Sequence, residues 1–436
     1  MADTTGEGIG VRATIQQALA LERDVLVLSV AMFAFSLGFQ MTTRFLPDYL
    51  AALGASSLII GVYGSAGNLL SAIFPYPGGA VSDRVGSRLA LTLFGLLSTI
   101  GFIIWLLAPL IGPLNVAGLT IEPWVWIFVG LILAQGWKSL GLGATFAIVK
   151  QAVSPDRLAR GFASTETVRR SAFLLGFLLT GFVLFSGGGT ILPGFIWVIA
   201  IAAGFGAAAT IVQHVFYDAS EDTVGESFRG IEQLVSDLRQ LPDPLRPLLV
   251  GDTLVRFANG MVYVFFIIVV TRHLAADARV LGVYLAPPVL FSVLLVIEMT
   301  IALVSMVPVS VAAERFGLKP VVAAGFSVYA VFPVLLILAP ADPVVLALLF
   351  AFSGLRFAGL PSHKALIVGP ARAGAGGRVT GAYYLVRNLI VIPSGAIGGL
   401  LWESGGPELA FGLATLIGLL GTGYFLAFGR EFSVYS

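Results

Sequence analysis

The chain has 436 residues, 57% of them apolar and only 11% charged, and its formal net charge is +1. A soluble domain carries about 25% charged residues, and a soluble core stops growing beyond about 250–300 residues, so most of this chain must face lipid rather than enclose a large core. The small net charge argues against a nucleic-acid partner, and the absence of cysteine excludes disulfides, thiolate metal sites and cysteine nucleophiles.

The chain begins with a polar segment, residues 1–24, that lacks the apolar core and cleavage site of a signal peptide. We expect it to stay in the cytoplasm, with the first span acting as the insertion signal. A helix needs about 20 apolar residues to cross the hydrocarbon layer. Apolar stretches predict twelve such spans, near 25–46, 58–81, 89–111, 123–149, 163–185, 191–215, 247–271, 280–312, 320–339, 343–368, 379–402 and 408–429.

One hydrophilic segment, 217–246, separates two sets of six spans. It begins acidic and then places apolar residues on one helical face, which predicts a short helix lying along the cytoplasmic surface; a regulatory contact is an alternative role. These residues are Phe228, Ile231, Leu234, Val235 and Leu238. The predicted domains are therefore an N-terminal bundle (25–216), this linker, a C-terminal bundle (247–430) and a cytoplasmic tail (431–436).

The basic residues orient the spans. Fifteen lie on the side of the N-terminus, the linker and the C-terminus, whereas the opposite loops hold two, Arg272 and Arg279. Because Lys and Arg accumulate in cytoplasmic loops, both termini are expected inside, as an even number of spans requires.

The two halves repeat each other. Shifted by 218 positions, 136–188 matches 354–406, which places Lys138 on Arg356 and Arg169 on Arg387. Gly61-Val62-Tyr63 also recurs as Gly282-Val283-Tyr284, but further from the following loop. The eighth span is therefore expected to be longer than the second or to carry an irregular turn near Pro287-Pro288. Paired six-helix units around a central site are typical of secondary transporters; duplication for stability alone is the alternative. The sequence thus predicts an all-α membrane protein with twelve transmembrane helices in two pseudo-symmetric six-helix bundles.

A loop motif occurs after the second span and again after the eighth. Both copies read Pro-x5-acid-Arg-x-Gly-x-base, with the glycine allowing a tight turn. The residues are Asp83, Arg84, Gly86 and Arg88 in the first copy, and Glu314, Arg315, Gly317 and Lys319 in the second. A carboxylate at such a helix end can bind the N-terminal turn of a helix in the other half. The repeat predicts two gate pairs, Asp83 with Arg387 and Glu314 with Arg169; ordinary positive-inside arginines are the alternative.

Ionisable residues within spans are costly and mark functional sites. The ionisable residues expected at a central cavity or in proton coupling are Lys138, Arg356, Glu298, Arg256 and Arg44. The polar residues Asn259 and Gln40 are expected there too, because they share helix faces with Arg256 and Arg44. Glu298, in the middle of the eighth span, is the proton-coupling candidate. The excess of positive charge favours either an anionic substrate or a network neutralised by substrate or proton. Alternatively, each base is structural and bonds backbone carbonyls or Glu298.

The first loop motif, Gly79-x3-Asp83-Arg84-x-Gly86-x-Arg88, resembles the loop motif of the major facilitator superfamily, although Ser87 replaces one of its paired basic residues. The degenerate second copy is also typical of that family. In the fourth span, Lys138-x2-Gly141-x-Gly143-Ala144 is similar to another pattern of the family, with Lys for Arg and one residue fewer. The resemblance covers essentially the whole chain and implies a twelve-helix secondary transporter.

The function expected is proton-coupled export (antiport) of a small amphipathic organic compound by alternating access. Uptake or exchange of a small organic anion is the alternative within transport, and a membrane sensor without transport is the alternative outside it. No nucleophile or metal constellation lies at membrane depth, so we expect neither an enzyme nor a metal or cofactor. The expected partners are the substrate, protons and membrane lipid, for a monomer in the cytoplasmic membrane of a prokaryote.

Overall fold

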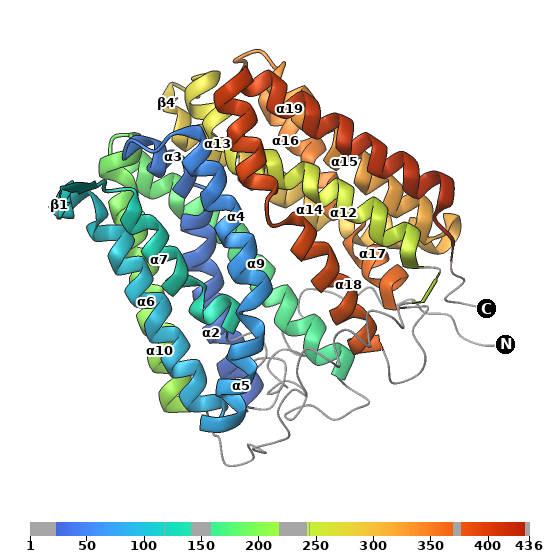
Figure 1. Ribbon diagram of the computed structural model, residues 1–436, viewed down its shortest axis with the longest axis horizontal. Helices are drawn as coiled ribbons and strands as arrows, with labels where there is room; N and C mark the ends of the chain where they lie inside the picture. Colours follow the sequence, from blue (N-terminus) through green and yellow to red (C-terminus); the bar gives the residue numbers. More distant parts are fainter. Residues whose placement is uncertain are drawn as a thin grey trace.

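The structure is a computed structural model that describes residues 23–116, 118–140, 158–217, 242–243, 245–368 and 376–431. The predicted surface helix of the linker, the segment up to residue 22 and the tail from residue 432 lie outside the described residues. The described part is mostly helical, with two short antiparallel hairpins. Figure 1 shows two helical bundles side by side, one from each half of the chain.

The N-terminal bundle consists of apolar helices and one hairpin. Its elements are α2 (Arg23–Thr43), α3 (Leu46–Ala52), α4 (Ser57–Ile73), α5 (Pro75–Val85), α6 (Ser87–Ile111), β1 (Leu114–Val116), β2 (Leu119–Ile121), α7 (Val125–Gln135), the π-helical turn η1 (Gly136–Leu140), α9 (Leu158–Ser186) and α10 (Ile191–Phe216). The second predicted span is divided into α4 and α5 at Phe74, just before a proline, which cannot donate the next helical hydrogen bond.

The C-terminal bundle is less regular. Its elements are α12 (Leu245–Val262), the 3-10 turn η2 (Tyr263–Phe265), α13 (Phe266–Ile268), the π-helical turn η3 (Val269–His273), β3 (Ala278–Val280), β4 (Val283–Leu285), α14 (Pro287–Phe316), α15 (Leu318–Ile337), α16 (Pro343–Gly354), the 3-10 turn η4 (Leu355–Phe357), α17 (Leu360–Val368), α18 (Gly376–Val391) and α19 (Ser394–Phe428). Within α19, Gly406 leaves the helical conformation at φ 85°. It therefore marks the boundary between the last two predicted spans.

The predicted start of the eighth span is wrong. Residues 278–285 form the β3–β4 hairpin, with Leu281 and Gly282 at positive φ in its turn. The helix begins at Pro287, because proline is accommodated in the first turn, where its missing N–H is not needed. At 30 residues, α14 matches the stretch 57–85 covered by α4 and α5. The expected longer span does not exist, and the likeness of Gly282-Val283-Tyr284 to Gly61-Val62-Tyr63 is not structural.

Seven helical stretches among the described residues are long and apolar enough to cross a membrane, and four shorter apolar helices accompany them. The seven are Ser87–Ile111, Ile191–Phe216, Leu245–His273, Pro287–Met306, Leu318–Ile337, Pro343–Ile367 and Gly381–Phe428. Large apolar side chains such as Phe182, Trp197 and Leu348 project outward and are more than 60% exposed. An outer surface of this kind suits lipid, and the protein is a multi-pass membrane protein.

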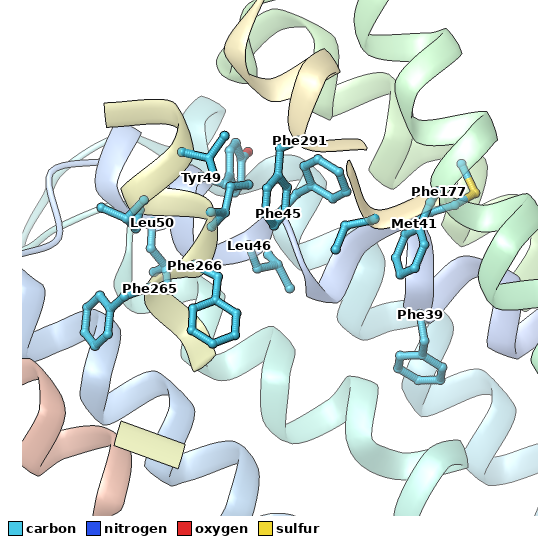
Figure 2. Packing of buried hydrophobic residues seen from close by; sticks show 14 of the residues in the cluster. Phe39, Met41, Phe45, Leu46, Tyr49, Leu50, Phe177, Phe265, Phe266 and Phe291 are labelled. Atoms are coloured by element: carbon cyan, nitrogen blue, oxygen red, sulfur yellow. The ribbon is translucent and has the colours of Figure 1, made fainter. Parts of the chain in front are cut away.

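The bundles meet along two helix pairs, α9 with α14 and α4 with α19. In Figure 2, buried residues of both bundles pack together near α3 and α13. The Phe45 ring meets the Phe291 ring edge-on, with centroids 5.6 Å apart. At the α4–α19 contact, a Cβ on Gly61 would overlap the carbonyl oxygen of Gly395, so only glycine allows the two backbones to lie this close.

Candidate functional site

A central cavity lies between the bundles and is lined by both. Its wall includes Arg44 of the turn between α2 and α3, Asn68 of α4, Lys138 of η1 and Tyr263 of η2. A neighbouring cavity shares Asn68 and Tyr263 and adds Arg256, Asn259 and Arg387 of the C-terminal bundle. Of the residues expected at a central site, the structure therefore places Arg44, Lys138, Arg256 and Asn259 on these walls.

Three of the lining or adjacent residues lie where the regular α-helix is interrupted. Lys138 belongs to the π-helical turn η1, Tyr263 to the 3-10 turn η2, and Arg356 to the 3-10 turn η4. Interruptions of this kind re-aim side chains and are frequent at functional sites. Lys138 and Arg356 come from opposite bundles, as the repeat predicted. Gln40 instead lies beside Gly176 of α9.

Glu298 of α14 joins the two bundles through a buried charge cluster. Its Oε2 atom lies 3.2 Å from Nη2 of Arg44, and its Oε1 atom lies 2.7 Å from Nη2 of Arg356. Ser353 donates a third bond to Oε1. The carboxylate thus binds Arg44, in the turn after α2 of the N-terminal bundle, and Arg356 of η4 in its own bundle. A cluster with two guanidinium groups and one carboxylate carries excess positive charge.

Aromatic rings support these two guanidinium groups. The Arg44 guanidinium lies 4.2 Å from the centre of the Tyr263 ring, and Arg356 lies 4.7 Å from Phe357 and 5.2 Å from Tyr329. Cations attract the negative face of such rings, and the attraction strengthens when water is excluded. The rings partly offset the charge that Glu298 leaves unbalanced.

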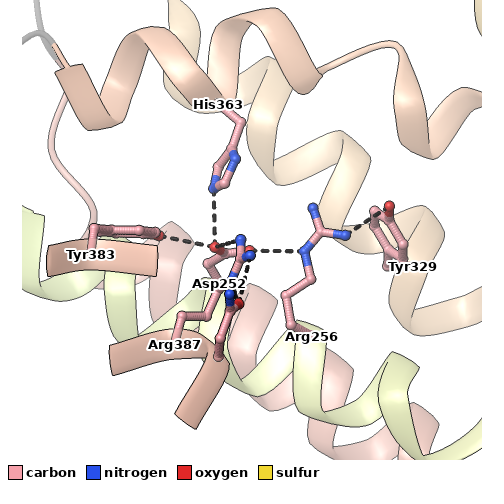
Figure 3. Close-up of polar contacts among 7 residues, drawn as sticks. Asp252, Arg256, Tyr329, His363, Tyr383 and Arg387 are labelled. Carbon is pink, nitrogen blue, oxygen red and sulfur yellow. Dashed lines mark hydrogen bonds and ion pairs between the residues drawn. The ribbon is translucent and has the colours of Figure 1, made fainter. Parts of the chain in front are cut away.

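A second cluster surrounds Asp252 of α12, and Figure 3 shows it. The fully buried carboxylate lies 3.2 Å from Arg256, 3.1 Å from Arg387 and 3.3 Å from Nε2 of His363, and Tyr383 donates to it. This cluster ties α12, α17 and α18 together within the C-terminal bundle. It also holds Arg387, which lines the second cavity.

Polar contacts also join the bundles at the end that carries α3 and the β3–β4 hairpin. Arg272 donates through Nε to Oδ1 of Asp48, at 2.5 Å, and through Nη2 to the Asp48 carbonyl. Burial outweighs the field of Arg272 and raises the pKa of Asp48. Nearby, Glu403 accepts from the Ser56 hydroxyl and from the Leu58 N–H at the start of α4. A carboxylate at a helix N-terminus is stabilised by the helix dipole.

The predicted gate residues are only partly visible. The side chains of Asp83, Glu314 and Arg169 lie outside the described residues, so their two pairs cannot be traced. Gly86 and Gly317 both adopt positive φ and precede α6 and α15. Among the described residues, no hydrogen bond or ion pair joins Arg84, Arg88, Arg315 or Lys319 to the other bundle. Arg84 and Arg315 are exposed, Arg88 donates to the His214 carbonyl, and the Lys319 N–H donates to Glu431.

Sequence reasoning missed several residues of these clusters. Asp252 lies near the edge of the predicted span 247–271, and Asp48 and Glu403 lie between predicted spans, so none of the three is a candidate by the rule for charges within spans. His363 shows no spacing to another histidine that indicates a site. One signal could have indicated the second cluster, because Asp252 lies four residues before Arg256 and so shares its helical face.

Comparisons with known proteins agree on one fold. An uncharacterized MFS-type transporter of Methanocaldococcus jannaschii is 22% identical over 404 residues, which cover 92% of this chain and 93% of the relative. The solved structure of the nucleoside transporter NupG, as its D323A mutant, is 13% identical with a TM-score of 0.73 and covers 93% of this chain and 100% of that one. A POT family transporter in complex with 5-aminolevulinic acid is 15% identical with a TM-score of 0.70, covering 95% and 99%.

The human organic anion transporter MFSD10 is 17% identical with a TM-score of 0.57 and covers 92% of this chain and 98% of that one. No family model matches the sequence. These likenesses define the class, which is that of a multi-pass membrane transporter. The sequence relative is an MFS-type transporter, so the resemblance to the major facilitator superfamily that the loop motif predicted is confirmed.

Proposed function

We propose that the protein is a secondary active transporter that moves a small organic solute by alternating access. Twelve membrane-crossing segments in two six-helix halves, with both termini in the cytoplasm, fit the apolar spans and the distribution of basic residues. One observation carries the proposal, namely the Arg44–Glu298 ion pair, 3.2 Å long, that connects the two bundles beside a cavity lined by both. An ion pair there can break and re-form as one bundle rocks against the other.

The two ends of the molecule have different roles in this proposal. Asp48–Arg272 and Glu403 close the end that carries the hairpins, which the basic-residue distribution assigns to the outside. The pairs Asp83–Arg387 and Glu314–Arg169 would close the cytoplasmic end in the opposite state. In the present structure Arg387 is bound to Asp252. It would have to exchange Asp252 for Asp83, or contact both.

For coupling, we propose protons, with Glu298 as the carrier. Protonating Glu298 removes the charge that holds Arg44 and Arg356. The same carboxylate therefore binds the proton and joins the two bundles, so that proton binding weakens the contact between them. Export in exchange for protons is the favoured direction. Uptake or exchange of a small organic anion is the second candidate, favoured by the excess of cationic side chains around the cavity.

The test is flux into proteoliposomes with a panel of neutral, cationic and anionic organic solutes, with and without a pH gradient. Concentrative flux that follows the gradient supports the proposal, and flux without gradient dependence supports anion exchange instead. Glu298→Gln should abolish concentration while leaving downhill exchange, and Glu122→Gln, at an exposed position outside both cavities, is the matched control. The absence of flux for every solute would favour a membrane sensor.

A further inference from the structure

We propose that Arg44 and Lys138 form a binding site for the charged head group of an amphipathic organic anion. The proposal rests on the transport function above and names the class of substrate for it. It starts from the composition of the central cavity wall. Two basic side chains line this cavity, and none of its described lining residues is acidic.

Arg44 is built as a site rather than as a surface charge. Its side chain is 6% exposed, and only Nη2 reaches Glu298. The other two nitrogens, Nε and Nη1, are buried without a hydrogen-bond partner among the described residues. Buried N–H groups are nearly always paired, and each of these two guanidinium nitrogens can donate a charge-assisted hydrogen bond to an oxygen of a carboxylate or phosphonate. Arg44 therefore has donor capacity left for a ligand.

Lys138 adds a second positive charge from the same wall. It is exposed, lines the cavity, and its ammonium lies 5.9 Å from the Phe39 ring. The charge balance points the same way, because Glu298 is the one carboxylate among the described residues that pairs with Arg44 and Arg356. An anion bound between Arg44 and Lys138 would neutralise the remaining charge in a setting where water screens it weakly.

The rest of the wall specifies the body of the ligand. Apolar and aromatic side chains face the same cavity, among them Leu131, Val264, Ile267 and Phe291, with Tyr263 against Arg44. Binding pockets commonly combine such walls with a few polar groups that fix orientation. The geometry thus fits an anionic head group attached to an apolar or aromatic body, and it disfavours cations.

The test uses matched probes that differ only in charge. Phenylacetate, phenylacetamide and phenethylamine are titrated into the purified, detergent-solubilised protein, followed by hexanoate and hexanamide. Dissociation constants come from calorimetry, and thermal unfolding gives an independent measure. We expect each acid to bind about tenfold or more tightly than its amide, as for hydrogen bonds to charged groups, and the amine not to bind.

Variants separate this site from general charge effects. Lys138→Gln should remove most of the preference for acid over amide, and Lys138→Glu should transfer it to the amine. Arg279→Gln loses the same charge on the exposed β3–β4 hairpin and should retain the preference. Equal or undetectable binding of acid and amide in both probe pairs, or an unchanged preference in Lys138→Gln, overturns the proposal.

Failure of this inference can be told apart from failure of transport. Proteoliposomes that concentrate a neutral or cationic solute, with no acid preference in binding, would keep the transport function and remove the anion site. Acid preference without flux of any solute would keep the site and remove transport.

Discussion

Removing Arg272 from its ion pair with Asp48 should shift the protein toward the state open at the hairpin end, and removing the Asp48 charge should not. Asp48 is 3% exposed in its side chain, whereas Arg272 is 41% exposed. Arg272→Gln leaves a carboxylate buried without its guanidinium. We expect a cost to the closed state of about 3 kcal/mol, the lower end of the range for broken buried pairs, because Arg272 is partly hydrated.

Opening hydrates Asp48 and relieves that cost, so the open-to-closed ratio should rise by roughly a hundredfold, at about 1.4 kcal/mol per factor of ten. Asp48→Asn leaves only a half-exposed arginine, which water can solvate. Because burial raises the pKa of Asp48, loss of its charge should leave the closed state unchanged or slightly favoured. The double variant should therefore resemble Asp48→Asn rather than Arg272→Gln, because the unpaired carboxylate is gone.

The assay is the distance between spin labels on the two hairpins, one per bundle. Because the chain has no cysteine of its own, Leu281→Cys and Thr120→Cys give a specific pair at exposed positions. Arg279→Gln is the control, since it removes a charge from the same hairpin as Leu281. Equal shifts for Arg272→Gln and Asp48→Asn would refute the reasoning from burial.

Three further outcomes follow from the same contacts. Glu403→Ala removes the acceptor for the Leu58 N–H and should raise the open-to-closed ratio two- to fivefold, as expected for about 0.3–1 kcal/mol at a helix N-terminus. The same label distance measures this ratio, and Glu403→Gln should raise it less. Glu298→Gln leaves Arg44 buried without a carboxylate and should lower the unfolding temperature in detergent, by far more than Glu403→Gln. Since burial raises the pKa of Asp48 in the closed state, that state binds a proton more tightly than one with Asp48 in water. Acidification toward that pKa should therefore populate the closed state, and a label distance independent of pH, or one that opens in acid, would contradict this.

Much of the architecture could be predicted because membrane spans are long apolar runs that periodicity and length identify without tertiary information. The start of the eighth span failed for the same reason. Residues 280–290 are as apolar as a helix, and only the pair Pro287-Pro288 and the turn at Gly282 distinguish a hairpin from a continuing span. Hydropathy is insensitive to that difference.

The cavity residues were partly predictable, because a polar or charged residue in an apolar helix must face the bundle interior. That rule indicates Arg44, Lys138 and Arg256, which line the two cavities. Pairing was not predictable to the same degree. Asp48 and Arg272 are separated by 224 positions, and nothing local marks either as the partner of the other.

The glycine contact between α4 and α19 limits how far these two helices can separate while they remain in contact. Where Gly61 meets Gly395 and Gly399, the two backbones touch without flexible side chains between them. Flexible side chains could follow a small displacement by changing rotamer, but rigid main chain loses its contact after a fraction of an ångström. The helices there are either fully docked or apart, so movement at this junction should be abrupt, with few partly separated forms.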